Sequence, residues 1–165
     1  MPVSEGELLK NAVLRVAELM AAAAKTAPKA RGVDNVVVAV IKNRNELDRL
    51  AKKMEELASE FGEFFARDAK NVRDSEAVVL IGVKVVDLGL KTPPDYKVDI
   101  NTVMSLLNLG IALGSAVKMA SLMNIDNRIM YTVGLAAQRL GLIDAEYVMG
   151  IPLSAHAKNI YFDRK

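Results

Sequence analysis

The sequence predicts a single domain, residues 1–165, of the α+β class, with a central sheet flanked by helices. Three observations predict this fold class. Two short runs of apolar, largely β-branched residues, 35–41 and 77–83, have the composition of buried strands. Apolar residues at helical spacing precede each run. Residues 100–125 carry one charged side chain, Lys118, which indicates a long apolar core helix or a dimer-interface helix.

The first element is a predicted helix that begins at a capping box, Ser4 with Glu7, and runs to about Lys25. One proline and one glycine then predict a loop over residues 27–34. The strand that follows, 35–41, is too apolar for an edge strand with one face in water. We therefore expect it to be buried on both faces.

A second helix is predicted to begin at Asn43 or Asn45 and to run to about Phe65. Polar side chains crowd the next stretch, residues 67–74. We interpret this stretch as a loop that forms either an exposed ion-pair cluster or the rim of a pocket or partner surface. Residues 77–83 follow as the second buried strand.

The second half of the chain starts with a Pro-rich stretch, residues 91–97, predicted to be an ordered loop or a lid. The apolar helix after it is long enough to span a bilayer. Its asparagines and serines, and the lack of a basic flank, favour a core or interface helix with no membrane contact. Residues 126–128 are a candidate ligand contact, although capping of a helix that ends before Gly141 is the simpler interpretation. A last short strand, 147–151, is expected to end at Pro152.

Composition excludes several kinds of chemistry. The chain has no cysteine and one histidine, so no thiolate-bound iron–sulfur cluster and no metal site are expected. His156 is expected to be a surface or capping residue. The net charge is +2, and the 22 basic residues are interleaved with 20 acidic ones, which argues against binding of nucleic acid. No signal-like apolar stretch opens the sequence, and we expect a cytoplasmic protein.

A family resemblance rests on five segments that span most of the chain: residues 20–35, 67–75, 109–117, 125–134 and 150–154. They resemble an uncharacterised prokaryotic family whose members are described as containing a ferredoxin domain. In that family, closely spaced cysteines lie between the second strand and the long helix. Here the corresponding residues, 86–97, contain none. The resemblance therefore implies the family scaffold without the cluster.

Three shorter motifs are similar to the flavin-dependent nitroreductase fold. The turn Ala27-Pro28-Lys29 resembles the turn that approaches the flavin in that fold, and residues 100–125 resemble the long helix of its dimer core. Gly150-Ile151-Pro152 resembles a late segment that precedes a basic tail. The Arg-Ser-x-Arg phosphate grip common in that fold is absent, and only Lys10 and Arg15 stand near the corresponding place.

This second resemblance implies a homodimer that binds flavin mononucleotide (FMN) and passes electrons from a nicotinamide donor to a small-molecule acceptor, as a flavin-dependent oxidoreductase. The phosphate needs basic side chains or helix N-terminal amides. The residues expected to contact the cofactor are therefore Pro28, Lys29, Arg31, Gly32, Asn35, Lys158 and Arg164. No catalytic residue is assigned. The alternative is that these are solvated surface residues of a non-enzymatic structural or binding relative that has lost the cluster, with or without the flavin.

Overall fold

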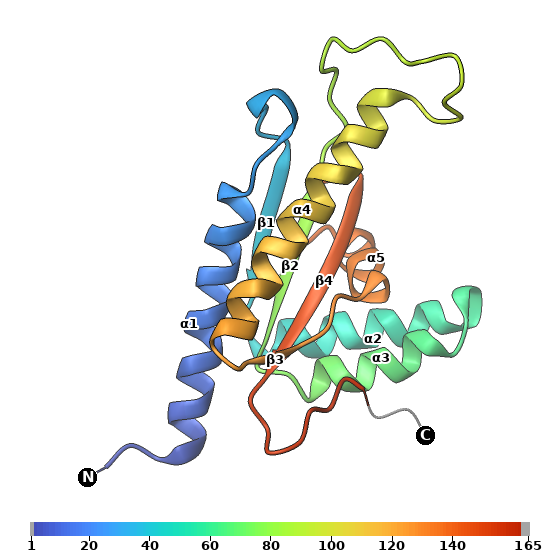
Figure 1. The fold of residues 1–165 in the computed structure, drawn as a ribbon. Helices are drawn as coiled ribbons and strands as arrows, with labels where there is room; N and C mark the ends of the chain where they lie inside the picture. Colours follow the sequence, from blue (N-terminus) through green and yellow to red (C-terminus); the bar gives the residue numbers. More distant parts are fainter. Residues whose placement is uncertain (1, 163–165) are drawn as a thin grey trace.

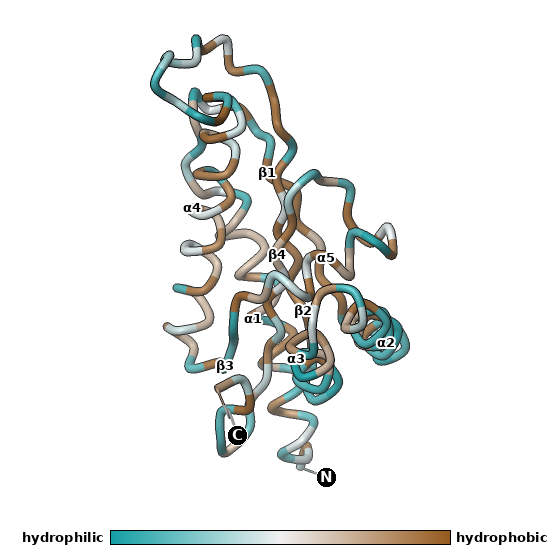
Figure 2. The backbone as a smooth tube through the Cα atoms, turned by 90° about the vertical axis from the view of Figure 1, so that its right-hand side faces the viewer, coloured by the Kyte–Doolittle hydropathy of each residue, from teal (hydrophilic) through white to brown (hydrophobic). Residues whose placement is uncertain are grey.

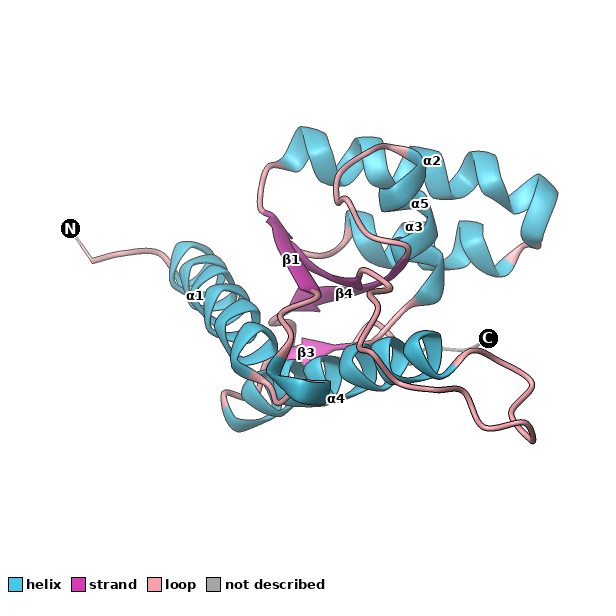
Figure 3. Ribbon diagram, turned by 90° about the horizontal axis from the view of Figure 1, so that it is seen from above, coloured by secondary structure: helices cyan, strands magenta, loops and turns pink. Residues whose placement is uncertain are grey.

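The computed structural model describes residues 2–162 and has three layers, with one antiparallel sheet between two groups of helices (Figures 1 and 3). The four strands have the order β1-β2-β4-β3. The elements in chain order are α1 (Glu5–Thr26), η1 (Ala30–Gly32), β1 (Val36–Ile41), α2 (Arg44–Phe61), α3 (Phe64–Arg73), β2 (Ala77–Val83), α4 (Ile100–Leu122), β3 (Asp126–Asn127), α5 (Tyr131–Arg139) and β4 (Tyr147–Ser154). The α+β prediction is confirmed.

Strand β2 supplies both halves of the core because alternate side chains point to opposite faces of a strand. Val79 and Ile81 pack with α1 and α4 on one face, and we call this side the first core. Val78 and Leu80 pack with α2, α3 and α5 on the other face, the second core. Every β2 residue is buried. The prediction of a strand buried on both faces is therefore correct for β2.

Strand β1 lies at an edge of the sheet, where the sequence had predicted a strand buried on both faces. It pairs only with β2, from Val36 opposite Val83 to Ile41 opposite Val78. Its two end residues are buried, and the four between them are half-buried. Helices of both layers cover its faces, so these side chains must be apolar even though the strand has only one strand neighbour. The apolar composition of β1 is therefore explained by the helices that cover its two faces, and its edge position in the sheet does not prevent this.

Residues 126–127 form strand β3 and do not cap a helix, which corrects the sequence interpretation. Helix α5 begins only at Tyr131. The two side chains expected to cap it have other partners. Asp126 accepts a hydrogen bond from Asn159 Nδ2 at 3.0 Å, and Asn127 Nδ2 donates to a backbone carbonyl at 3.0 Å. Pairing with the end of β4 therefore takes precedence over helix formation here.

Pro152 lies inside β4, although it was expected to end the strand. The Gly150 amide donates to the carbonyl oxygen of Met130, on the side of β4 that also pairs with β3. The backbone nitrogen of Pro152, two residues later in the strand, therefore faces that side too. The chain opposite leaves the ladder at residues 128–129, between β3 and the Met130 bridge. The missing N–H of proline thus coincides with a gap in the neighbouring strand, and β4 can continue.

Most of residues 67–74 are helical, which corrects the prediction of a loop, because α3 covers all but the last of them. Asp68 is 5% exposed and accepts a hydrogen bond from Thr132 Oγ1 of α5 at 2.9 Å. Arg73 forms an ion pair with Glu55 of α2. The polar cluster therefore joins three helices of the second core to one another.

Helix α4 is mostly apolar, with a few hydrophilic residues along it (Figure 2). Only one side of it is buried. Its inner side packs on α1 and the sheet in the first core. Its outer side is exposed. We call its apolar part, Leu106, Leu107, Gly110, Ile111 and Gly114, the open face of α4, and the exposed Lys118 follows one turn later on the same side. Within residues 2–162, α4 is the one helix long and apolar enough to cross a membrane, and 39% of its most apolar window is buried.

Candidate functional site

Five of the seven expected cofactor contacts lie together in the loop between α1 and β1, at the upper end of the sheet in Figure 1. They are Pro28, Lys29, Arg31, Gly32 and Asn35. Helix α1 ends ahead of Pro28, and the short turn η1 follows. Arg31 and Gly32 adopt φ values of 54° and 69°, in the left-handed region that lets a chain reverse within a few residues. We call residues 27–35 the first loop.

Two basic side chains of the first loop are held by backbone carbonyls. Lys29 Nζ donates to two carbonyl oxygens at the end of α1, at 2.5 and 2.9 Å. Arg31 Nη1 donates to the carbonyl oxygen of Leu88 at 2.5 Å. Neither cation forms an ion pair within residues 2–162, whereas Lys25 pairs with Asp34 at 2.7 Å and lowers the pKa of that carboxyl. Lys29 and Arg31 are thus fixed in place without a direct ion pair, and the Lys29 charge adds to that of Lys25 in lowering the pKa of Asp34.

Asn35 belongs to a buried polar network that joins the first loop, the end of β2 and α4. Its Nδ2 donates to the carbonyl of Lys84 at 2.8 Å and to Ser105 Oγ at 3.2 Å. Its Oδ1 accepts from Asn108 Nδ2 at 3.0 Å, and Asn108 Oδ1 accepts from the amide of Ala30 at 2.8 Å. All three side chains are at most 4% exposed. A buried network whose members are mutually bonded fixes one backbone arrangement, here that of the first loop.

The α4 part of this network was not among the residues expected to contact a cofactor. Asn101, Ser105 and Asn108 follow the spacing i, i+4, i+7, which places them on one face of a helix. Asn101 Oδ1 accepts from the amide of Leu88 at 3.0 Å, so the same face also holds the start of the Pro-rich segment. This helical spacing of polar residues inside an apolar stretch is the sequence feature that could have predicted the network.

Lys158 lies at the other end of the sheet, beyond β4, and Arg164 lies outside the described residues. Six strand residues at about 3.3 Å each put roughly 20 Å between the two ends of β1. The tail docks on its own chain through Tyr161, which is 2% exposed. The Tyr161 hydroxyl is 2.9 Å from Ser75 Oγ, and its carbonyl accepts from Arg128 Nη1 at 2.8 Å. A single chain therefore does not bring Lys158, in the described part of its tail, to its first loop.

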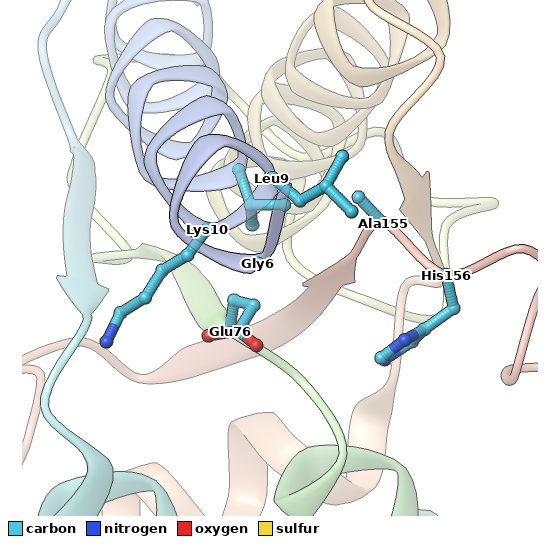
Figure 4. A pocket seen from close by; sticks show the side chains of 7 residues that line it. Gly6, Leu9, Lys10, Glu76, Ala155 and His156 are labelled. Atoms are coloured by element: carbon cyan, nitrogen blue, oxygen red, sulfur yellow. The ribbon is translucent and has the colours of Figure 1, made fainter. Parts of the chain in front are cut away.

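A small cavity lies at the lower end of the molecule, under the N-terminal half of α1 (Figure 4). Its volume is about 160 Å³, and its lining residues are Gly6, Leu9, Lys10, Val13, Glu76, Ala155 and His156. His156 Nε2 is 3.0 Å from the carbonyl oxygen of Asp74. Lys10 and His156 lie far apart in the sequence, and only the fold brings them to one cavity.

A thiolate-bound iron–sulfur cluster does not fit this chain, because such clusters need Cys ligands and the sequence has none. Within residues 2–162, no three Asp, Glu or His side chains are grouped to hold a metal ion. The Pro-rich segment is held by protein contacts. Thr92 Oγ1 donates to Asp99 at 3.0 Å and accepts from the amide of Ile100 at 3.1 Å.

Solved structures with a similar fold are nitroreductase-like flavoproteins. A nitroreductase with bound FMN from Desulfitobacterium hafniense matches 96% of this chain and 80% of its own, with a TM-score of 0.61 and 16% identity. The NADPH:FMN oxidoreductase of Vibrio harveyi, complexed with NAD+, matches 96% of this chain and 63% of its own, with a TM-score of 0.57 and 15% identity. Nitroreductase A of Vibrio parahaemolyticus matches 96% of this chain and 62% of its own, with a TM-score of 0.58 and 15% identity.

The chain thus spans less than two thirds of the two Vibrio proteins. At these identities the likeness shows the fold, which is nitroreductase-like, as predicted.

Sequence comparisons identify the family. A family described as "Uncharacterized protein containing a ferredoxin domain" matches residues 99–164. An uncharacterized protein of Archaeoglobus fulgidus is 40% identical over 181 residues, which cover 99% of this chain and 98% of the relative. The protein therefore belongs to this family of uncharacterized proteins described as containing a ferredoxin domain, and it does so without a cysteine.

Proposed function

We propose that the protein is a homodimer that binds FMN between its two chains and acts as a flavin-dependent oxidoreductase. The observation that carries the proposal is the distance, within one chain, between two groups of residues expected to contact FMN. The first loop and the described part of the tail lie at opposite ends of the sheet, and α4 runs from one end to the other. A twofold axis perpendicular to α4 reverses the direction of that helix in the partner. It would therefore bring the first loop of one chain towards the tail end of the other.

The open face of α4 supports a second copy of the chain as its partner. Leu106, Leu107 and Ile111 are 40%, 53% and 46% exposed. A Cβ added at Gly110 or Gly114 would meet no atom within 4 Å, so another helix has room to approach closely. Burying this face would stabilise a dimer by about 25 cal/mol for each Å² of apolar surface removed from water.

Lys29 and Arg31 fit the phosphate of FMN. Both are cations without an ion-pair partner in the described chain, and Arg31 keeps further N–H donors after its bond to Leu88. Pro28 and Gly32 beside them are exposed. When bound, FMN supplies the redox centre that takes hydride from a nicotinamide donor and reduces a small-molecule acceptor. The contribution of the chain is to bind and orient it.

One observation favours a second candidate function, that of a non-enzymatic structural or binding protein. All the side-chain hydrogen bonds of Asn35 are made inside the protein, and Lys29 bonds to its own helix end. The first loop is thus ordered by internal contacts alone. A scaffold that is ordered in this way can serve a protein partner after the loss of cluster and flavin.

Titration of FMN, followed by the quenching of its fluorescence, separates the two candidates, together with the visible absorbance of the purified protein. We expect quenching, and we expect Arg31→Ala to weaken binding about tenfold or more, because a charged hydrogen-bond partner of the phosphate is lost. Lys52→Ala, an exposed change on α2, is the matched control and should leave affinity unchanged. A colourless protein that leaves FMN unquenched would support the second candidate.

Light scattering tests the dimer separately. A monomer at micromolar concentration would contradict the two-chain site, even if FMN were bound.

A further inference from the structure

The cavity under the N-terminal half of α1 is lined by two opposite charges that do not pair. Lys10 extends from α1, and Glu76 stands just before β2 (Figure 4). Neither side chain has a hydrogen bond or ion pair with any residue in the range 2–162. Glu18, two turns further along the same helix, does pair: it binds both Lys42, at 2.5 Å, and Arg15, at 3.3 Å. The cavity therefore holds one positive and one negative side chain whose charges are not used by the fold itself.

Apolar side chains complete the wall of the cavity. Leu9 and Val13 come from α1, and Ala155 follows β4. In Figure 4, Lys10 and His156 lie on opposite sides, with Glu76 between them. A molecule that matches this wall carries a positive and a negative group together with a small apolar part.

His156 adds a directional group. Its Nε2 lies 3.0 Å from the Asp74 carbonyl oxygen, which can only accept, so this nitrogen carries the hydrogen. In that tautomer Nδ1 is an acceptor, and it has no partner in the described chain. A ligand ammonium, with three N–H donors, can serve a carboxylate and a second acceptor at once.

We propose that this cavity binds a free α-amino acid with a small apolar side chain. The ligand carboxylate pairs with Lys10, its ammonium pairs with Glu76, and its side chain contacts Leu9 and Val13. A volume of about 160 Å³ limits the ligand to a few non-hydrogen atoms. The site is formed by one chain alone and requires neither FMN nor a second copy, so it stands apart from the proposed oxidoreductase site.

The experiment uses the one histidine of the chain, whose imidazole proton signals in NMR report on this cavity alone. Titration with L-alanine is expected to give a saturable shift of these signals. Ethylamine and propionate have a similar size but carry one charge each, and each should bind about tenfold more weakly or worse. Lys10→Met and Glu76→Gln should each weaken alanine binding by a similar factor.

The matched controls are Lys52→Met and Glu60→Gln, both exposed on α2, and both should leave alanine binding unchanged. Propionate or ethylamine binding as tightly as alanine would overturn the assignment to a zwitterion. Absence of a saturable shift would overturn the site itself. If Glu76→Gln fails to fold, Lys10→Met, which changes an exposed residue, decides the test. Alanine affinity should be equal with and without added FMN, so failure of either proposal leaves the other standing.

Discussion

Two pairs of glycines show how differently the two faces of the sheet are completed. On the α5 side, a Cβ added at Gly134 would lie 1.9 Å from the carbonyl oxygen of Val148, and one at Gly150 would lie 2.1 Å from a side-chain carbon. On α4, a Cβ at Gly110 or Gly114 would meet nothing within 4 Å. Glycine thus permits close packing of α5 on β4 in one region, and it leaves space beside α4 in the other. Its presence in a sequence does not distinguish the two.

The tail reinforces this difference. Tyr161 packs into the second core and closes that side with a segment of the same chain. The open face of α4, on the first-core side, has no such cover within residues 2–162. We therefore place the proposed partner on α4 and expect the second core to respond to changes as a closed, tightly packed region.

The largest effect is expected for Gly134→Ala. The added methyl group overlaps a backbone carbonyl that cannot move without disturbing β4, so the free energy of unfolding should fall by about 3 kcal/mol or more. Urea denaturation of the purified variant measures this change. A variant as stable as the parent protein would show that α5 and β4 are not in close contact.

A smaller effect is expected from pH at Tyr161. Burial raises the pKa of its hydroxyl to about 12, from an ordinary value of 10.0. The unfolded chain therefore loses this proton first, so the contribution to stability is complete below about pH 10 and is lost as pH rises to about 12. Two pKa units correspond to about 3 kcal/mol.

Urea denaturation across this pH range should show the loss in the parent protein. Tyr161→Phe lacks the titrating group, and its stability should fall less over the same range. Parallel curves for the two proteins would mean that the tail is not docked in solution.

The smallest effect on stability is expected for Gly110→Ala, the counterpart of the first variant. The position is exposed and helical, so alanine should raise the free energy of unfolding of one chain by about 0.5–1 kcal/mol. In the proposed dimer the same methyl group keeps the helices apart and weakens association. Light scattering on dilution should then show dissociation at a higher concentration than for the parent protein. An unchanged dimer would remove Gly110 from the interface.

The sequence by itself determined the elements whose cause is local. The bounds of β2, Ala77–Val83, follow from a run of apolar residues. The start of α1 follows from Ser4, whose Oγ accepts from the Glu7 amide at 3.3 Å. Gly141 has the left-handed φ of 66° expected just after a helix. The lack of any cysteine also decided, without a structure, that no thiolate-bound cluster can form.

Only the tertiary structure decided features that depend on residues far apart in the chain. Pro152 is accepted in β4 because the strand opposite is interrupted, and residues 126–127 become a strand because the end of β4 is beside them. The first loop and Lys158 are expected to share a ligand, yet they lie at opposite ends of the sheet. Lys10 and Glu76 meet at one cavity only after folding. These outcomes depend on strand pairing and helix packing, which sequence periodicity does not encode.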